Sequence, residues 1–156
     1  MQQKRLNLER PIKFENFKPV IGTVNRKYPT SFYVAGKTYI TPCNDEDDYH
    51  ETMKKMESSI KANLKRFLTS NEVLGREFIL NFEVSENGLK YGKNSYLFFQ
   101  MFFTQRKFNT LPEIITFMEP SVSKILTEMK QSIETSGFRI VSNGSRKSIY
   151  SKLFEQ

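Results

Sequence analysis

The stretch Asn94-Ser-Tyr-Leu-Phe-Phe-Gln-Met-Phe-Phe-Thr-Gln105 decides the fold that this sequence predicts. Its side chains are apolar on both faces of an extended chain, and Gln100 is the one polar interruption between Tyr96 and Phe103. A strand of this kind belongs in the middle of a sheet, with other structure over each side. We therefore expect residues 94–105 to form a central strand that is covered on both faces.

The segment before this strand predicts its hairpin partner. Phe78, Leu80, Phe82 and Val84 alternate with polar residues, as in a half-buried strand. Asn87-Gly88 then provides the strongest short hairpin signal in the chain. We expect residues 78–84 to pair antiparallel with residues 94–105.

A long amphipathic helix is expected upstream of the hairpin. Asn44 is a good N-cap, and Asp45, Glu46, Asp47 and Asp48 would then lie in the first turn, where the helix dipole favours acids. Apolar residues follow at steps of three and four and form one stripe: Tyr49, Met53, Met56, Ile60, Leu64 and Phe67.

The region after the central strand predicts helical structure and then a further strand. Thr110-Leu-Pro-Glu113 has the spacing of a capping box and opens a short helix, which Pro120 is expected to kink or restart. Gly137 is placed at a helix end, residues 138–141 read as a strand, and residues 149–154 as a last strand or short helix. A second apolar stripe follows Pro120: Val122, Ile125, Leu126, Met129 and Ile133.

Residues 20–24, 31–34 and 37–41 have a β pattern, with Ala35-Gly36 expected as a two-residue turn. The fragment Ala35-Gly-Lys-Thr38 resembles the end of a phosphate-binding P-loop. That loop needs glycine at the position of Ser31 and a helix after Lys37-Thr38, whereas a β-forming run follows here. We therefore interpret the fragment as a hairpin turn and Lys37 as a residue beyond that turn.

The order β-α-β-β-α-β predicts an α+β two-layer sandwich of the ferredoxin-like type. We expect an antiparallel sheet with two main helices on one face, an extra N-terminal hairpin and an extended N-terminal arm. The chain of 156 residues fits one domain. We expect residues 1–19 to be the arm and residues 20–156 a single α+β domain.

The basic charge of the chain is concentrated near its N-terminus. Residues 1–40 hold eight basic residues and two acids, so they carry most of the net charge of +7 of the whole chain. Interleaved basic and apolar residues in the arm suggest that it docks on its own domain or on a neighbouring subunit, while a solvated basic tail is the alternative. The predicted partner-binding residues of the arm are Lys4, Arg5, Leu6, Leu8, Arg10, Ile12, Lys13, Phe14, Phe17 and Lys18.

Two arrangements of reactive residues are weak candidates for chemistry. On a helix, Asp47 could share a face with Glu51, and Glu46 with His50, but acids in a first helical turn are expected without a metal. Cys43 and His50 could form a nucleophilic pair, although a lone cysteine is more often a small buried hydrophobe. We expect no catalytic residue, no cofactor and no metal site.

Aromatic residues on the central strand make nucleic acid a candidate partner. Tyr96, Phe98 and Phe102 share one strand face, and sheets of the RNA-recognition type stack bases on such residues, although the aromatic motif of that type is not matched. Exposure of this face would favour nucleic acid, and burial would favour an assembly contact. The candidate nucleic-acid contacts are Lys90, Tyr91, Lys93, Tyr96, Phe98, Arg146 and Lys147.

The sequence favours a non-enzymatic structural or assembly subunit that acts through protein partners, in a homo-oligomer. Two alanines, no tryptophan and many Lys, Asn, Ile and Phe residues are typical of an AT-rich genome. This bias suggests a bacteriophage virion component of the ring, neck or tail type. A nucleic-acid-binding protein is the alternative, and an enzyme is less favoured. No small-molecule substrate is expected.

A reducing, cytoplasmic location is expected, or the virion if the chain is phage-encoded. The single cysteine excludes an internal disulfide. The N-terminus lacks the apolar core of a signal peptide, and the longest apolar run, residues 96–103, is too short to span a bilayer. No membrane partner is therefore expected.

Overall fold

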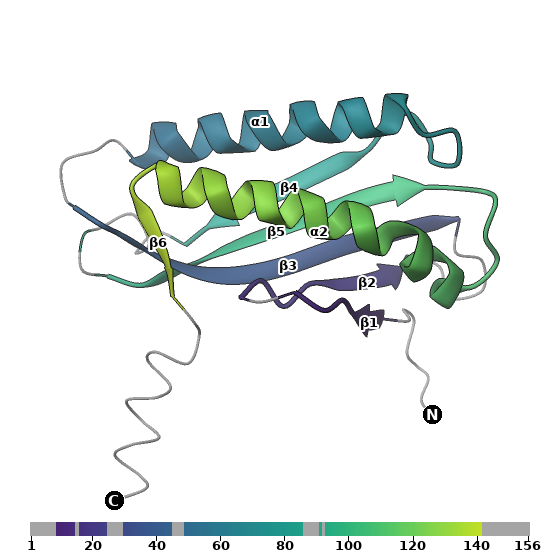
Figure 1. Ribbon diagram of the computed structural model, residues 1–156, viewed down its shortest axis with the longest axis horizontal. Helices are drawn as coiled ribbons and strands as arrows, with labels where there is room; N and C mark the ends of the chain where they lie inside the picture. Colours follow the sequence, from purple (N-terminus) through teal and green to yellow (C-terminus); the bar gives the residue numbers. More distant parts are fainter. Residues whose placement is uncertain are drawn as a thin grey trace, which may run out of the picture.

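The computed structural model describes residues 9–14, 16–24, 30–44, 49–85, 91 and 93–141. All strand pairings are antiparallel, and they join the strands into one six-stranded sheet. Figure 1 shows α1 and α2 side by side across one face of this sheet. The predicted two-layer α+β sandwich is thus confirmed. The elements are β1 (Glu9–Pro11), β2 (Val20–Thr23), β3 (Ser31–Pro42), α1 (Tyr49–Thr69), β4 (Ile79–Val84), β5 (Ser95–Thr104), α2 (Leu111–Thr135) and β6 (Phe138–Val141).

The sheet is built around β3 and β5, which pair along almost their whole lengths. β4 pairs with the other side of β5, so β5 is the central strand that its two apolar faces predicted. β2 and β6 share the remaining side of β3, β2 pairing with residues 32–35 and β6 with residues 39–42, and β1 extends the sheet beyond β2. With two strands end to end on this side of β3, the ferredoxin-like strand order stays a prediction.

The turn predicted at Ala35-Gly36 is wrong, because residues 31–42 form one continuous strand. Gly36 lies opposite Phe99, and a Cβ on Gly36 would come within 2.6 Å of the Phe99 ring. Glycine inside a strand often marks such a close approach. The glycine is therefore required by packing, and it is not at a chain reversal.

Helix α1 buries the predicted stripe. Tyr49, Met53, Met56, Ile60 and Leu64 are buried, but the stripe ends on Leu68, and Phe67 is only half-buried. Leu68 lies four residues after Leu64, so it continues the stripe one position further round the helix than Phe67. Residues 45–48 lie outside the described part of the chain, so the cap at Asn44 and the acids of the first turn stay predictions.

Helix α2 runs as a single helix through Pro120, so of the two expected effects, a kink or a restart, the restart is not found. Pro120 is exposed, where the backbone carbonyl it leaves free can be hydrated. The capping box of Thr110 and Glu113 is confirmed, and Gly137 has a φ of 97° just beyond the helix end. In the described part of the chain, neither helix combines the length and the apolar character needed to cross a bilayer.

Residues 9–14 and 16–19 are docked on the chain's own sheet. Ile12 and Phe17 belong to the hydrophobic core, and the Phe17 carbonyl accepts a 2.8 Å hydrogen bond from the Lys37 amide. Asn16 and Lys18 have φ values of 73° and 45°, which turn the backbone on either side of Phe17. The described part of the arm therefore takes the first of the two arrangements expected for it.

Candidate functional site

The two faces of β5 differ in burial. Leu97, Phe99 and Met101 are fully buried, on the face that α1 and α2 cover. The alternate residues Tyr96 and Phe98, with Phe102, are only half-buried, because no described helix or strand lies over them. The sequence predicted cover on both faces of this strand, and the described structure provides it on one.

The uncovered side of the sheet, called here the outer face, presents alternate residues of three adjacent strands. Lys37 and Phe98 are neighbours across β3 and β5, as are Tyr39 and Tyr96, and Tyr33 and Phe102. Glu83 of β4 lies on the other side of Phe98. The outer face comprises Tyr33, Ala35, Lys37, Tyr39, Ile79, Asn81, Glu83, Tyr96, Phe98, Gln100 and Phe102.

A cation lies among the aromatic rings at one end of the outer face. The Lys37 Nζ is 4.4 Å from the centroid of the Tyr96 ring and 5.8 Å from that of Tyr39. Such cation–π contacts contribute roughly 0.5–1 kcal/mol at exposed sites. The lysine side chain is exposed, so its ammonium remains open to a partner while the two rings hold it over the sheet.

At the other end of the outer face, Tyr33 is engaged by the acid Glu9. The Tyr33 hydroxyl donates a hydrogen bond to the Glu9 carboxylate, and the Tyr33 ring lies 6.0 Å from that of Phe102. Burial, then the Glu9 hydrogen bond and the Glu9 charge, raise the pKa of Tyr33. Tyr33 is therefore a structural part of the sheet, and the accessible aromatic surface is centred on Tyr39, Tyr96 and Phe98.

The predicted nucleic-acid contacts are divided by the structure. Tyr96 and Phe98 lie on the outer face. Tyr91 and Lys93 are exposed just before β5, and the Lys93 carbonyl accepts a 3.1 Å hydrogen bond from Thr41 Oγ1, which ties this segment to the end of β3. Lys90, Arg146 and Lys147 lie outside the described residues.

The arm residues fall into three groups. Arg10, Lys13 and Lys18 are exposed, and Phe14 is half-buried. Ile12 and Phe17 lie in the domain's own core. The remaining arm residues predicted to bind a partner lie outside the described part: Lys4, Arg5, Leu6 and Leu8.

Lys37 and Tyr39 are members of the outer face that the sequence interpretation did not place there. The predicted turn at Ala35-Gly36 separated them from Tyr33 and put Lys37 at the end of a hairpin. The alternation of Tyr33, Ala35, Lys37 and Tyr39 along one uninterrupted strand is the signal that would have grouped them.

The residues that were weak candidates for chemistry are not arranged as a reactive site in the described part of the chain. Lys37 stands in the middle of β3, where no helix follows, so the P-loop resemblance is excluded. Cys43 is exposed, against the expectation of a buried cysteine, and His50 is exposed as well. In the described ranges no three His, Cys, Asp or Glu residues gather as metal ligands, and residues 45–48 fall outside those ranges.

A second surface feature is an apolar hollow at one end of β4 and β5. It has a volume of about 430 Å³ and is lined in part by Phe78, Phe102 and Phe103. Ile79 and Val24 border it and are 61% and 48% exposed. β4 pairs with β5 alone among the described strands, so its other edge is available for pairing next to this hollow.

No family model matches this sequence, and neither a curated protein nor a solved structure shows significant similarity to it.

Proposed function

We propose that this chain is a non-catalytic binding protein that receives single-stranded nucleic acid on the outer face of its sheet. The observation that carries the proposal is the Lys37 ammonium 4.4 Å from the Tyr96 ring, in a half-exposed row with Tyr39 and Phe98. An open face was expected to favour nucleic acid and a buried face to favour assembly, and Tyr96, Phe98 and Phe102 are half-buried on the side of the sheet that no described helix covers.

The outer face offers both interactions that single strands need. Unpaired bases stack on aromatic side chains, with a contribution of roughly 1–3 kcal/mol for each base. Lys37 of β3 provides a cation for a backbone phosphate beside those rings. The exposed Lys93 comes just before β5, the strand that carries Tyr96 and Phe98. A duplex keeps its bases stacked inside, so the flat aromatic face fits single strands better.

Glu83 limits how strongly this face can bind. It is exposed and lies opposite Phe98, so it repels a phosphate placed between β4 and β5. We therefore place the path of the nucleic acid over Tyr39, Tyr96, Lys37 and Phe98, on the side of β5 that faces β3 and away from β4.

Fluorescence anisotropy with a labelled single-stranded oligonucleotide of about 12 nucleotides, in the range covered by one small domain, tests the proposal. We expect binding that weakens steeply with salt, and weaker binding of a duplex of the same length. Phe98→Ala or Tyr96→Ala should weaken binding at least about fivefold, as the loss of one stacked base requires. Lys37→Gln should lower the slope against salt by about one.

Lys54→Gln, at an exposed position of α1, is the matched control and should bind like the parent chain. The proposal fails if binding is absent at low salt, or if Phe98→Ala and Lys37→Gln bind as well as Lys54→Gln.

The second candidate is the assembly subunit that the sequence favoured, here in a homo-oligomer such as a virion ring, neck or tail. The exposed Ile79 and Val24 beside the apolar hollow support it, because exposed apolar patches of this kind often mark protein contacts. Sedimentation distinguishes the two candidates. If the parent chain is oligomeric and Ile79→Lys makes it monomeric, assembly is supported; a parent chain that is monomeric at all concentrations contradicts it.

A further inference from the structure

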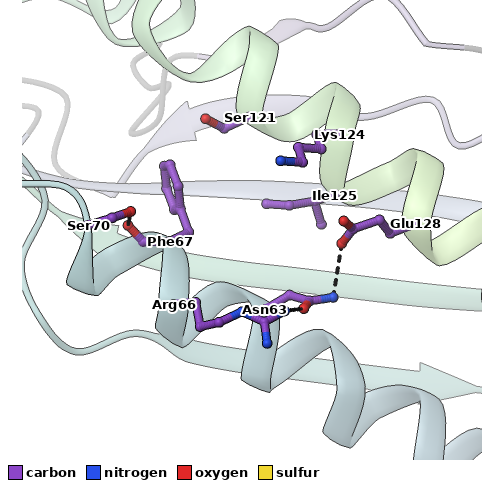
Figure 2. A pocket seen from close by; sticks show the side chains of 8 residues that line it. All are labelled: Asn63, Arg66, Phe67, Ser70, Ser121, Lys124, Ile125 and Glu128. Atoms are coloured by element: carbon purple, nitrogen blue, oxygen red, sulfur yellow. Dashed lines mark hydrogen bonds between the residues drawn. The ribbon is translucent and has the colours of Figure 1, made fainter.

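A cavity lies between the helices, on the layer opposite the outer face. It has a volume of about 320 Å³, at the lower end of the range for small-molecule sites. Phe67 of α1 and Ile125 of α2 form its apolar part, and Figure 2 shows the Phe67 ring reaching from α1 toward α2. The helices therefore leave a pocket between them although both pack on the same sheet.

One end of this cavity is closed by a polar bridge between the helices. Asn63 Nδ2 donates a 2.9 Å hydrogen bond to the Glu128 carboxylate, and Arg66 donates to the Asn63 side-chain oxygen (Figure 2). The single acid of the lining is thus engaged with Asn63. Two basic residues, Arg66 and Lys124, leave the cavity with an excess of positive charge.

Two polar groups of the cavity have no partner in the described part of the chain. The Lys124 ammonium takes part in no ion pair or hydrogen bond there, and the Ser121 hydroxyl makes no hydrogen bond. Both side chains come from α2 and point toward the space between the helices in Figure 2. They lie one helical turn apart, so one anionic group can contact both.

We propose that this cavity binds a small amphipathic anion, in which a carboxylate or phosphate is attached to an aromatic or branched aliphatic group. The anionic group is held by Lys124 and Ser121, and the apolar group packs on Phe67 and Ile125. Arg66 lies on the facing helix and adds to the positive potential. This site differs in place and in ligand from the outer face, and the sequence did not anticipate a small-molecule ligand.

Titration of the ¹⁵N-labelled chain followed by NMR tests the site, with phenyl phosphate as the amphipathic probe. We expect saturable shifts in the amides of residues 66–70 and 121–125. Inorganic phosphate and benzyl alcohol each carry half of the recognised chemistry and should bind at least about fivefold more weakly. Lys124→Gln should weaken phenyl phosphate about tenfold, as expected for the loss of one charge-assisted hydrogen bond.

Lys130→Gln is the matched control, because this lysine lies on the same helix but does not line the cavity. It should bind phenyl phosphate like the parent chain. The proposal is overturned if Lys124→Gln and Lys130→Gln bind equally, if inorganic phosphate binds as tightly as phenyl phosphate, or if the shifts fall on β3 and β5 instead.

Discussion

Gly36 of β3 and Phe99 of β5 lie opposite each other, and the Phe99 ring occupies the space where a side chain of residue 36 would stand. A Cβ built on Gly36 would lie 2.6 Å from Phe99 Cζ and 3.1 Å from the Phe17 carbonyl oxygen. The ring of Phe17 is 6.3 Å from that of Phe99. This contact joins the two central strands to the N-terminal segment in one part of the core.

Gly36→Ala should therefore destabilise the fold by about 2 kcal/mol, because overpacking a filled core costs roughly 1–3 kcal/mol. Chemical denaturation measures the free energy of unfolding. In a double-mutant cycle with Phe99→Leu, the two changes together should cost less than the sum of the single changes, since the smaller side chain makes room for the methyl group. Simple additivity would show that the ring does not exclude the side chain.

Phe98→Ala and Phe99→Ala compare the two faces of β5 at adjacent positions. Phe99 is fully buried, so its truncation should cost about 3–5 kcal/mol. Phe98 is half-buried on the outer face, and its truncation should cost about 1 kcal/mol. Thermal or chemical unfolding of both variants measures the difference. Equal costs would mean that the outer face is covered in solution, as in an assembly contact.

Thr38→Val should stabilise the chain by about 1 kcal/mol. The Thr38 hydroxyl is fully buried and has no hydrogen-bond partner among the residues that the structure describes, and valine has nearly the same shape without the polar atom. Thr41→Val is the matched control on the same strand. The Thr41 hydroxyl donates to the Lys93 carbonyl, so its loss should destabilise by about 1 kcal/mol. Denaturation midpoints that move in the same direction for both variants would contradict this account of Thr38.

Tyr33→Phe should remove part of the loss of stability at alkaline pH. The pKa of Tyr33 is raised by burial and by Glu9, so its stabilising contribution is present below the unfolded pKa of about 10 and is lost as pH rises further. In that range the unfolded chain releases the proton first, which favours unfolding by up to about 1.4 kcal/mol for each pH unit. The free energy of unfolding between pH 9 and pH 11, roughly the range around that value, provides the measurement. The idea is wrong if Tyr33→Phe has the same slope as the parent chain.

Local patterns predicted most of the elements. The stripe of α1, the capping box at Thr110, the helix end at Gly137 and the central position of β5 follow from side-chain spacing and from the conformational preferences of single residues. The error at Ala35-Gly36 arose because glycine serves a turn and a close packing contact equally well. Only the position of Phe99 distinguishes the two.

The sequence by itself determined which residues alternate along each strand, and hence which side chains share a face. Tertiary structure decided which face is covered, because α1 and α2 can lie on one side of the sheet only through contacts between residues far apart in the chain. The same non-local packing brought Lys37 over Tyr96, from strands separated by a whole helix and another strand. The composition of the candidate site was thus present in the sequence, whereas its exposure and its central cation depended on the fold.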